Sequence, residues 1–440
     1  MPGVPGPDDT LRATLNNGIV VYARPNFASP SIVIAGYLPA GAIYEPEDRI
    51  GLAGFTASML LRGTKDYTHQ QLFDILEGMA ATLAIRGHIH TTTFQGRALA
   101  EDLPTLLQLL AQALRWPTFP NDELEKRRAQ ILTHLAVRKQ DTTARAAETA
   151  HALLYTPTHP YGRTMDQVEA GVRATHRDDM LAFHRRYYGP RGMVIAVVGA
   201  VEPEAALEHV RAAFEDWINP DQPEAAPSLP PVHLPEQELR QEVAIPDKSQ
   251  ADIVLATIGP SRFAEDYLPA ALGNSILGRF GMMGRIGKVV REQAGLAYYA
   301  YSSLSGGMGP GPWDVIAGVA PENVARALAL IQQEVRRFVE EGVTEDELAD
   351  VQSQAIGSLP LELETNAGVA QALLHLERYR LGLDYYRRYP AIIRSITTEQ
   401  VNAAIRHYWH PGRWAIGIAG PPMAEARPSP TLEPIGEKRP

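Results

Sequence analysis

The sequence contains two segments that match each other at one fixed offset. Residues 180–199 align with residues 401–420 without a gap, and Pro190 and Pro411, which are equivalent in this alignment, lie 221 positions apart. The same shift places residues 32–35 on residues 253–256. Self-similarity at close to half of the 440-residue length indicates a duplicated folding unit. The chain is therefore predicted to fold as two similar domains in tandem.

Both halves show the same order of local patterns. Short β-branched runs bounded by proline and glycine, such as residues 18–22 and 32–34, predict strands. Apolar residues spaced by three and four, from Leu103 to Leu114 and from Leu328 to Phe338, predict amphipathic helices. In each half a late helix leads through a Pro/Gly turn into an apolar strand. This mixture predicts an α+β fold in which each domain has an antiparallel-rich sheet with helices packed on one face.

Proline content gives the domain boundaries. Residues 220–236 are too rich in proline to continue a helix or a central strand, and we interpret them as a linker. Residues 1–219 then form an N-terminal α+β domain, and residues 237–420 form a C-terminal α+β domain. The polar, proline-rich residues 421–440 are interpreted as a flexible tail.

Composition excludes several classes of protein. The chain has no cysteine, which removes disulfides, thiol nucleophiles and thiolate zinc sites. A net charge of −10, from 41 basic and 51 acidic residues, argues against a nucleic-acid partner. No apolar run reaches the ~18 residues that suggest a membrane span, and residues 193–201 are interpreted as a buried strand. The N-terminus lacks the pattern of a secretory signal, so we expect a cytoplasmic location, or a periplasmic one if a leader has been removed.

Residues 51–64 resemble the catalytic helix of a known peptidase family, and they read Gly51-Leu-Ala-Gly54-Phe-Thr-Ala57-Ser58-Met-Leu-Leu-Arg62-Gly63-Thr64. The family is that of pitrilysin and the mitochondrial processing peptidase, the inverzincins, whose helix has the pattern Gly-x-Ala-His-x-x-Glu-His. Gly54 and Ser58 occupy the positions of the two histidines, and Ala57 occupies that of the catalytic glutamate. These side chains cannot supply two imidazoles for zinc and a carboxylate to deprotonate its water. We therefore expect no metal and no other cofactor in this chain.

Three histidines leave one alternative open. His134 stands where the resemblance implies the family's third zinc ligand, a glutamate. His88 and His90 alternate along a predicted strand, so their side chains share one face. Together with His134 they could form a displaced metal site. The other interpretation is a polar strand that faces a cavity, with His134 exposed.

Residues 277–287 include Gly278, Gly281 and Gly284 at a spacing of three. The segment matches neither the dinucleotide fingerprint nor the Walker pattern with its Lys-Ser/Thr ending, so we do not expect nucleotide binding. The resembling family has a glycine-rich segment just before its next motif. The resemblance therefore implies a mobile, substrate-facing loop at these three glycines.

The next motif, residues 290–303, is similar to the family's Arg-x-x-x-x-Gly-x-x-Tyr region. Arg291 and Tyr298 fall on its arginine and tyrosine, seven residues apart, and Gly295 lies between them. A guanidinium and a phenol can both donate hydrogen bonds to a substrate carbonyl and to the oxyanion formed when water adds. The resemblance implies a catalytic role for both residues; the alternative is that Tyr298 packs and Arg291 forms an exposed ion pair.

Shorter similarities extend over nearly the whole chain, at residues 38–45, 115–124 and 159–163. The resemblance therefore implies the metallohydrolase-like fold of processing peptidases. In heterodimers of this family, one half-length chain carries the zinc helix and the other supplies the arginine and tyrosine.

This mixture of retained and missing residues implies a non-catalytic subunit that is inactive as a peptidase by itself. Its partner would be a homologous subunit that carries His-x-x-Glu-His and holds the zinc, and the substrates would be peptides bound in a closed chamber. The alternative is a proteolytically inactive homodimer that binds peptides or acts as a scaffold.

Overall fold

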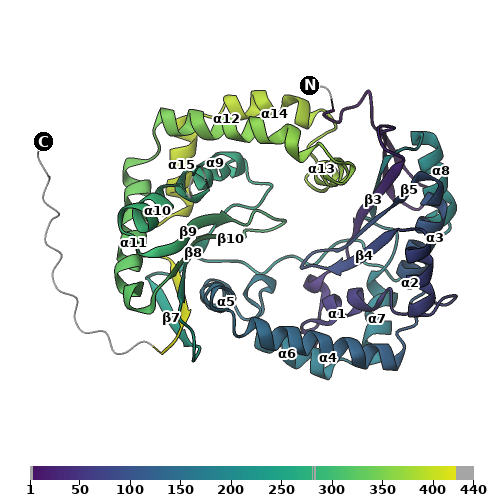
Figure 1. Cartoon of the computed structure of the whole chain (residues 1–440), viewed down its shortest axis with the longest axis horizontal. Helices are drawn as coiled ribbons and strands as arrows, with labels where there is room; N and C mark the ends of the chain where they lie inside the picture. The colour runs from purple at the N-terminus through teal and green to yellow at the C-terminus, as the bar shows by residue number, and fades with distance from the viewer. Residues whose placement is uncertain (1–2, 280, 282–283, 423–440) are drawn as a thin grey trace, which may run out of the picture.

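The computed structural model describes residues 3–279, 281 and 284–422, and it contains two halves with one sheet each (Figure 1). The described N-terminal half has a six-stranded sheet in the order β1-β2-β6-β3-β5-β4. These strands are β1 (Leu11–Thr14), β2 (Val20–Pro25), β3 (Ser31–Leu38), β4 (Thr82–Gly87), β5 (Thr92–Leu99) and β6 (Val194–Gly199). The described C-terminal half has a five-stranded sheet in the order β7-β11-β8-β10-β9. These strands are β7 (Leu239–Ala244), β8 (Ala251–Ile258), β9 (Ala297–Leu304), β10 (Pro312–Val319) and β11 (Ala415–Gly420).

The two sheets share one topology. Strands β2, β6, β3, β5 and β4 correspond in order to β7, β11, β8, β10 and β9. Each sheet has one parallel pair, β2–β6 and β7–β11, and its remaining described pairs are antiparallel. The predicted α+β fold with two antiparallel-rich sheets is confirmed. The apolar run at 193–201 contains β6, in which every residue is buried.

Helices from the same half cover one face of each sheet. In the N-terminal half these include α2 (His69–Gly78), α3 (Leu103–Arg115) and α8 (Pro203–Phe214). In the C-terminal half they include α9 (Tyr267–Gly278), α11 (Val324–Glu341) and α15 (Thr398–Tyr408). The apolar spacing works as predicted, since Leu106, Leu110 and Leu114 are fully buried on α3.

The second face of each sheet is covered by a helix from the other half. Helix α5 (Thr142–Leu154) packs on β8 and β11, and α13 (Asn366–Arg378) packs on β3 and β6. The contact at α5 is close, because a Cβ placed on Gly417 of β11 would lie 2.0 Å from the Ala146 carbonyl oxygen. The prediction of helices on one face therefore holds only for the helices that belong to the same half as the sheet. Each half also lends one helix to the sheet of the other half, and this helix exchange joins the two halves through apolar contacts.

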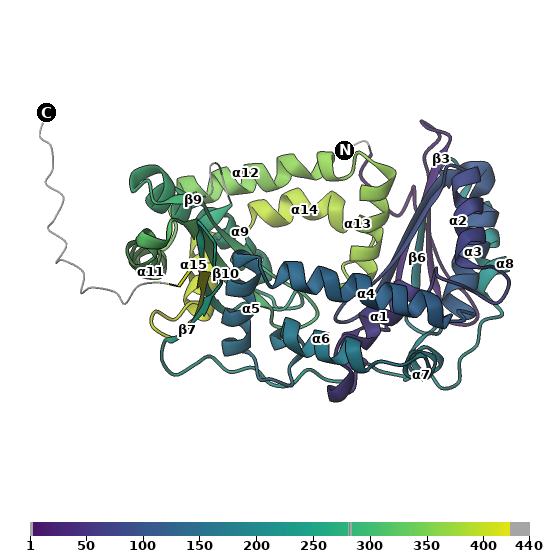
Figure 2. The same cartoon turned by 60° about the horizontal axis from the view of Figure 1, so that its bottom comes forward.

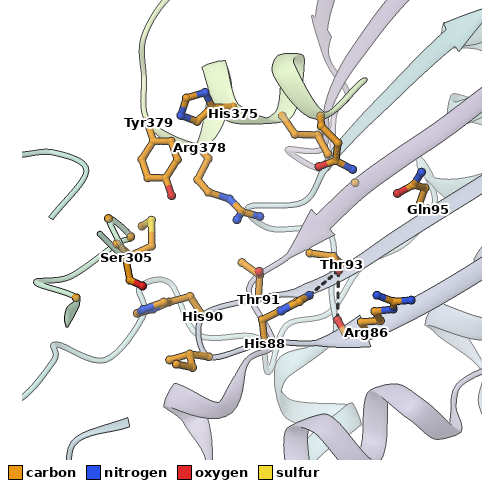
Figure 3. A pocket seen from close by; sticks show the side chains of 18 of the residues that line it. Arg86, His88, His90, Thr91, Thr93, Gln95, Ser305, His375, Arg378 and Tyr379 are labelled. Atoms are coloured by element: carbon orange, nitrogen blue, oxygen red, sulfur yellow. Dashed lines mark hydrogen bonds between the residues drawn. The ribbon is translucent and has the colours of Figure 1, made fainter. Parts of the chain in front are cut away.

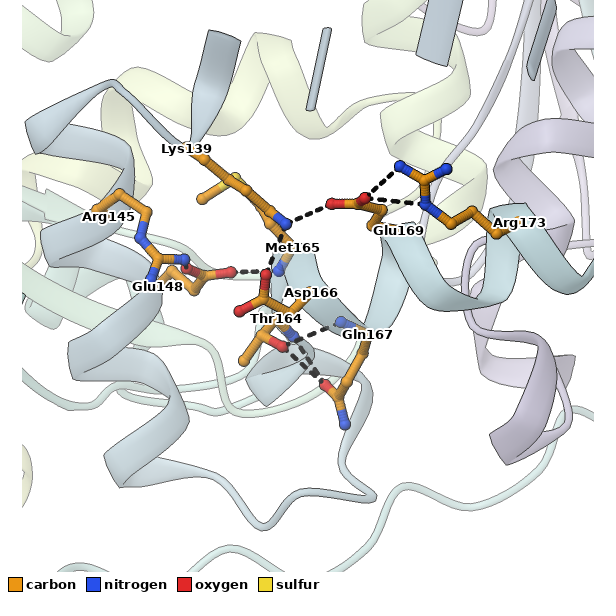
Figure 4. Close-up of polar contacts among 9 residues, drawn as sticks. All are labelled: Lys139, Arg145, Glu148, Thr164, Met165, Asp166, Gln167, Glu169 and Arg173. Carbon is orange, nitrogen blue, oxygen red and sulfur yellow. Dashed lines mark hydrogen bonds and ion pairs between the residues drawn. The ribbon is translucent and has the colours of Figure 1, made fainter. Parts of the chain in front are cut away.

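Long helices connect the two sheets around these exchanged helices (Figure 2). Helices α4 (Asn121–Arg138) and α6 (Met165–Ala174) run along one side, and α12 (Glu345–Glu362) and α14 (Tyr385–Arg394) run along the other. Polar contacts hold α5 against α6 (Figure 4). Glu148 of α5 pairs with Arg145 and accepts a hydrogen bond from the Met165 backbone, while Lys139, just after α4, pairs with Asp166 and Glu169 of α6.

Between α8 and β7, residues 215–238 form neither helix nor strand, in the stretch that includes the predicted linker 220–236. Beyond residue 422, the predicted tail lies outside the described residues. Among the described helices, none combines the length and the hydropathy needed to cross a membrane.

Candidate functional site

A cavity of about 1120 Å³ lies between the two halves (Figure 3). Its floor is formed by β4 and β5, on the face of the N-terminal sheet that α13 covers only at β3 and β6. In the described sheet, β4 is an edge strand. The end of α13 lines one side. The loop at 305–311, between β9 and β10, lines another. The cavity therefore combines side chains from both halves of the duplicated chain.

His88 and His90 lie in the turn between β4 and β5, and both line the cavity. His88 Nε2 is 3.0 Å from Thr93 Oγ1, and His90 Nε2 is 2.7 Å from the Tyr161 hydroxyl. Gly309 of the C-terminal half donates its backbone N–H to the same hydroxyl at 3.2 Å. Burial, with the positive charge of Arg378, lowers the pKa of His88 and lowers the pKa of His90 to about 4. Both imidazoles are therefore neutral at pH 7.

Helix α13 brings His375 and Arg378 to the cavity (Figure 3). Burial, reinforced by the charges of Arg262 and Arg378, lowers the pKa of His375 to about 4, and its Nδ1 is 2.8 Å from the Tyr386 hydroxyl. The guanidinium carbon of Arg378 lies 4.3 Å from the centre of the Tyr37 ring, within the range of a cation–π contact. Burial raises the pKa of Tyr37 to about 12, so its ring remains neutral beneath the cation.

His151 of α5 also lines the cavity, and its Nε2 lies 3.1 Å from both carboxylate oxygens of Asp314. Burial acts to lower the pKa of His151, but the charge and the hydrogen bond of Asp314 outweigh it and raise this pKa. Asp314 lies on β10, so this contact joins helix α5 of the N-terminal half to the C-terminal sheet.

The helix that resembles the zinc helix is α1 (Leu52–Met59), and it lies beside the end of β4. Its first backbone donors are satisfied by Glu45, which accepts hydrogen bonds from the Gly51 and Ala53 N–H groups at 3.0 and 2.7 Å. Arg163 pairs with the same carboxylate at 2.7 Å. Two of the short family-like segments, 38–45 and 159–163, thus meet at the start of α1.

The positions equivalent to zinc ligands do not fit a metal ion. Ala57 is 1% exposed, and the Ser58 hydroxyl donates to the Phe55 carbonyl of the same helix at 2.8 Å. Gly54 carries no side chain, and its Cα would lie 2.9 Å from a Cβ on Gly87. His134 lies on α4 and is exposed. In the part of the chain that the structure describes, no three or more His, Cys, Asp or Glu side chains form a group that could hold a metal ion, and this includes His88, His90 and His134.

Tyr298 and Arg291 lie at the edge of the C-terminal half. Tyr298 is in the edge strand β9, where the pairing with β10 shifts from Tyr299–Gly318 to Ala297–Val319. Tyr298 is therefore the extra residue of a β-bulge, which turns a side chain out of the regular alternation, and it is 63% exposed. Arg291 lies in the helical segment Lys288–Gln293, and Gly295, with φ +65°, makes the turn between them. Neither residue lines the cavity described above.

The three glycines of the predicted substrate loop also lie away from the lining of the cavity. Gly278 ends α9, and a Cβ there would lie 2.1 Å from the Ser302 backbone nitrogen. Gly284 has φ +63°, and its Cβ would meet the Gly278 backbone at 2.6 Å. Gly281 has φ +60°. Close packing and left-handed backbone conformations account for glycine at these positions.

Sequence patterns alone did not reveal the role of Arg378, His375 and Tyr161 in the cavity. Tyr161 belongs to the segment 159–163, and the family-like pattern of this segment could have pointed to Tyr161 as a candidate site residue. The other two residues lie on α13, and the repeat offset of 221 makes this helix the counterpart of α5. The sequence thus pairs the two helices, but it does not say that each crosses to the opposite sheet.

Comparison with protein-family models gives two matches. Residues 22–165 match the model described as insulinase (peptidase family M16). Residues 175–355 match the model described as the peptidase M16 inactive domain.

Individual relatives are similar over most of their length. An uncharacterized zinc protease of Mycobacterium tuberculosis is 25% identical over 413 residues, which cover 93% of each chain. The mitochondrial-processing peptidase subunit beta of Mus musculus is 25% identical over 426 residues, 94% of this chain and 85% of the relative. A crystal structure of a peptidase M16 inactive domain from Pseudomonas fluorescens superposes with a TM-score of 0.84 at 25% identity, covering 95% of this chain and all of that one.

Proposed function

Because the chain belongs to the M16 peptidase family, we propose that it is the metal-free subunit of a heterodimeric zinc endopeptidase. A homologous partner that carries His-x-x-Glu-His holds the zinc, and this chain is inactive as a peptidase alone. The mouse relative is itself described as a subunit, which is consistent with a paired assembly.

One contrast carries this proposal. The helix α1 is retained as a packed element, with Leu52, Phe55 and Met59 in the core, but Gly54 and Ser58, at its two histidine positions, and Ala57, at its glutamate position, offer no metal-binding set. In the other half, Tyr298 presents its phenol to the exterior at a bulge in an edge strand. Tyr298 is 63% exposed and so is accessible to a partner, and bulges often redirect side chains next to active sites.

In the assembled enzyme, Tyr298 and Arg291 act across the subunit interface. The Tyr298 hydroxyl and the Arg291 guanidinium donate hydrogen bonds to the peptide carbonyl and to the oxyanion that forms from it. The extended peptide adds to the sheet edge at β4, where backbone groups pair with it largely independently of its sequence.

Reconstitution tests the proposal. The chain is mixed with an M16 homologue that carries the zinc helix, and cleavage of a fluorogenic peptide is measured with wild type, Tyr298→Phe and a control, Tyr187→Phe. Loss of an oxyanion donor typically lowers kcat by about a hundredfold, so this loss is expected for Tyr298→Phe alone. Tyr187 lies on α7 (Arg177–Tyr187) of the N-terminal half and packs against Tyr44, whereas Tyr298 lies in β9 of the C-terminal half. Equal activity of all three mixtures would remove the role of Tyr298.

The alternative is an inactive homodimer that binds peptides or serves as a scaffold. Native mass spectrometry separates the two assemblies. A stable homodimer that persists when the zinc-bearing homologue is added would replace the heterodimer with this alternative.

A further inference from the structure

The cavity between the halves has an unusual charge for this protein. The whole chain carries ten more acidic than basic residues, yet no aspartate or glutamate is among the described residues that line the cavity. Its walls instead carry two arginines, Arg86 and Arg378, together with histidines, threonines and glutamine. Asp314 lies behind His151, accepts its hydrogen bond, and is not among the residues that line the cavity. The cavity is therefore a cationic chamber in an acidic molecule.

Arg378 has no carboxylate of its own. Among the described residues it forms no ion pair, and its Nε is buried without a hydrogen-bond partner. The neighbouring acid on the same helix, Glu377, is already used: it pairs with Arg12 at 2.8 Å and accepts a hydrogen bond from the Tyr22 hydroxyl at 2.6 Å. A buried guanidinium donor without a partner is costly, because such groups are normally satisfied by protein, water or ligand.

The positive charge of Arg378 affects the histidines that line the chamber. Its charge contributes to the lowered pKa of His88, His90 and His375, after burial in each case. These imidazoles are neutral at pH 7 and do not compensate the cation. In Figure 3 the Arg378 side chain extends from α13 into the chamber, opposite His88 and Thr93. The described lining of the chamber therefore supplies no counter-charge for Arg378.

Arg86 places a second cation on the floor. It lies on the edge strand β4, opposite Thr93 of β5, and it is exposed on the face that lines the cavity. Leu83 and Ile85 of the same strand contact the apolar core on the other face. A peptide added alongside β4 would therefore lie next to Arg86, in the same cavity that Arg378 lines.

We propose that the chamber holds a carboxylate of the bound peptide at Arg378, with Arg86 as a second cationic contact. The substrate class is then a peptide with an acidic side chain or a free C-terminus in the chamber. The planar guanidinium fork matches a carboxylate in two parallel hydrogen bonds, which gives both affinity and orientation. This inference rests on the proposed function only in requiring that the chamber binds peptides.

Binding by the single chain tests the proposal without a partner and without cleavage. Fluorescence anisotropy is measured with one short fluorescent peptide in forms that differ only in a central Glu or Gln, and in a free or amidated C-terminus. The form with Gln and an amidated end is expected to bind about tenfold more weakly than the best carboxylate form. The arm that loses affinity identifies the source of the carboxylate.

Variants locate the site. Arg378→Gln and Arg86→Gln are each expected to weaken the carboxylate form while leaving the Gln, amidated form unchanged. Arg394→Gln is the matched control: it removes the same charge from an exposed position on α14 that does not line the cavity. Arg378 packs on Tyr37, so Arg378→Gln could unfold the protein. In that case Arg86→Gln, which does not disturb this packing, and Arg378→Lys, which keeps the charge but loses the planar fork, still test the site.

Each remaining outcome counts against the carboxylate site. Equal binding of all peptide forms would overturn it while leaving peptide binding, and hence the peptidase subunit, intact. Equal weakening by Arg394→Gln would show a general charge effect and would overturn it too. If no form binds, the carboxylate site is rejected, and the reconstituted cleavage assay decides separately on the proposed function.

Discussion

The exchange of α5 onto the C-terminal sheet predicts a large effect for one added methyl group. Gly417 lies in the middle of the buried strand β11, directly under α5. In Gly417→Ala the new Cβ would lie 2.0 Å from the Ala146 carbonyl oxygen and 2.7 Å from the Ala150 nitrogen. Ordinary contact begins near 3.4 Å, so the helix must retreat by roughly 1.4 Å. Both opposing atoms are backbone, which cannot rotate away.

Overpacking of a core by this amount typically costs 1–3 kcal/mol, and we expect about 3 kcal/mol here because a whole helix must move. The assay is urea unfolding followed by tryptophan fluorescence, since Trp313, Trp409 and Trp414 are buried in the C-terminal half and report its loss. The urea midpoint of Gly417→Ala is expected to fall.

A second glycine gives the opposite sign and serves as the control. Gly357 lies in α12, is exposed, and a Cβ there would meet nothing within 4 Å. Gly357→Ala is therefore expected to stabilise the fold by up to about 1 kcal/mol through helix propensity. If Gly417→Ala unfolds at the wild-type midpoint, α5 does not pack on β11 as described, and the helix exchange is refuted.

Three other predictions concern the buried charges and the metal. Glu45→Gln removes one member of the buried pair with Arg163 and is expected to cost about 3 kcal/mol in urea unfolding; a loss below about 0.5 kcal/mol would contradict the burial of this pair. In the folded chain the pKa of His375 is about 4, so between pH 6.5 and 4 this imidazole binds a proton in the unfolded chain but not in the folded one. His375 is therefore expected to lower the free energy of unfolding by up to about 3 kcal/mol as the pH falls through that range. Unfolding experiments should show a smaller slope for His375→Gln than for wild type, and the slope that remains comes from other buried histidines such as His90. EDTA is expected to leave the thermal midpoint of the isolated chain unchanged, because the α1 positions offer no metal-binding set; a midpoint that falls with EDTA and returns with zinc would reverse this interpretation.

The sequence predicted the repeated part of the fold well. An offset of 221 between Pro190 and Pro411 implied equal topology, and the two sheets share the order of five corresponding strands. The sequence did not reveal the bulge at Tyr298, because a bulge depends on the register with β10, and register is a property of two strands together. The spacing from Arg291 to Tyr298 indicated which residues to consider but not that Tyr298 would be exposed.

The sequence by itself determined the duplication, the α+β class, the presence of Gly54, Ala57 and Ser58 in the segment that resembles a zinc helix, and the absence of thiol chemistry. These follow from residue identity and local periodicity. Only the tertiary structure decided that α5 and α13 exchange sheets, and hence that Arg378 reaches the cavity floor formed by the other half. The physical reason is that periodicity shows which side of a helix is apolar, but not which of two similar apolar sheet faces will bury it.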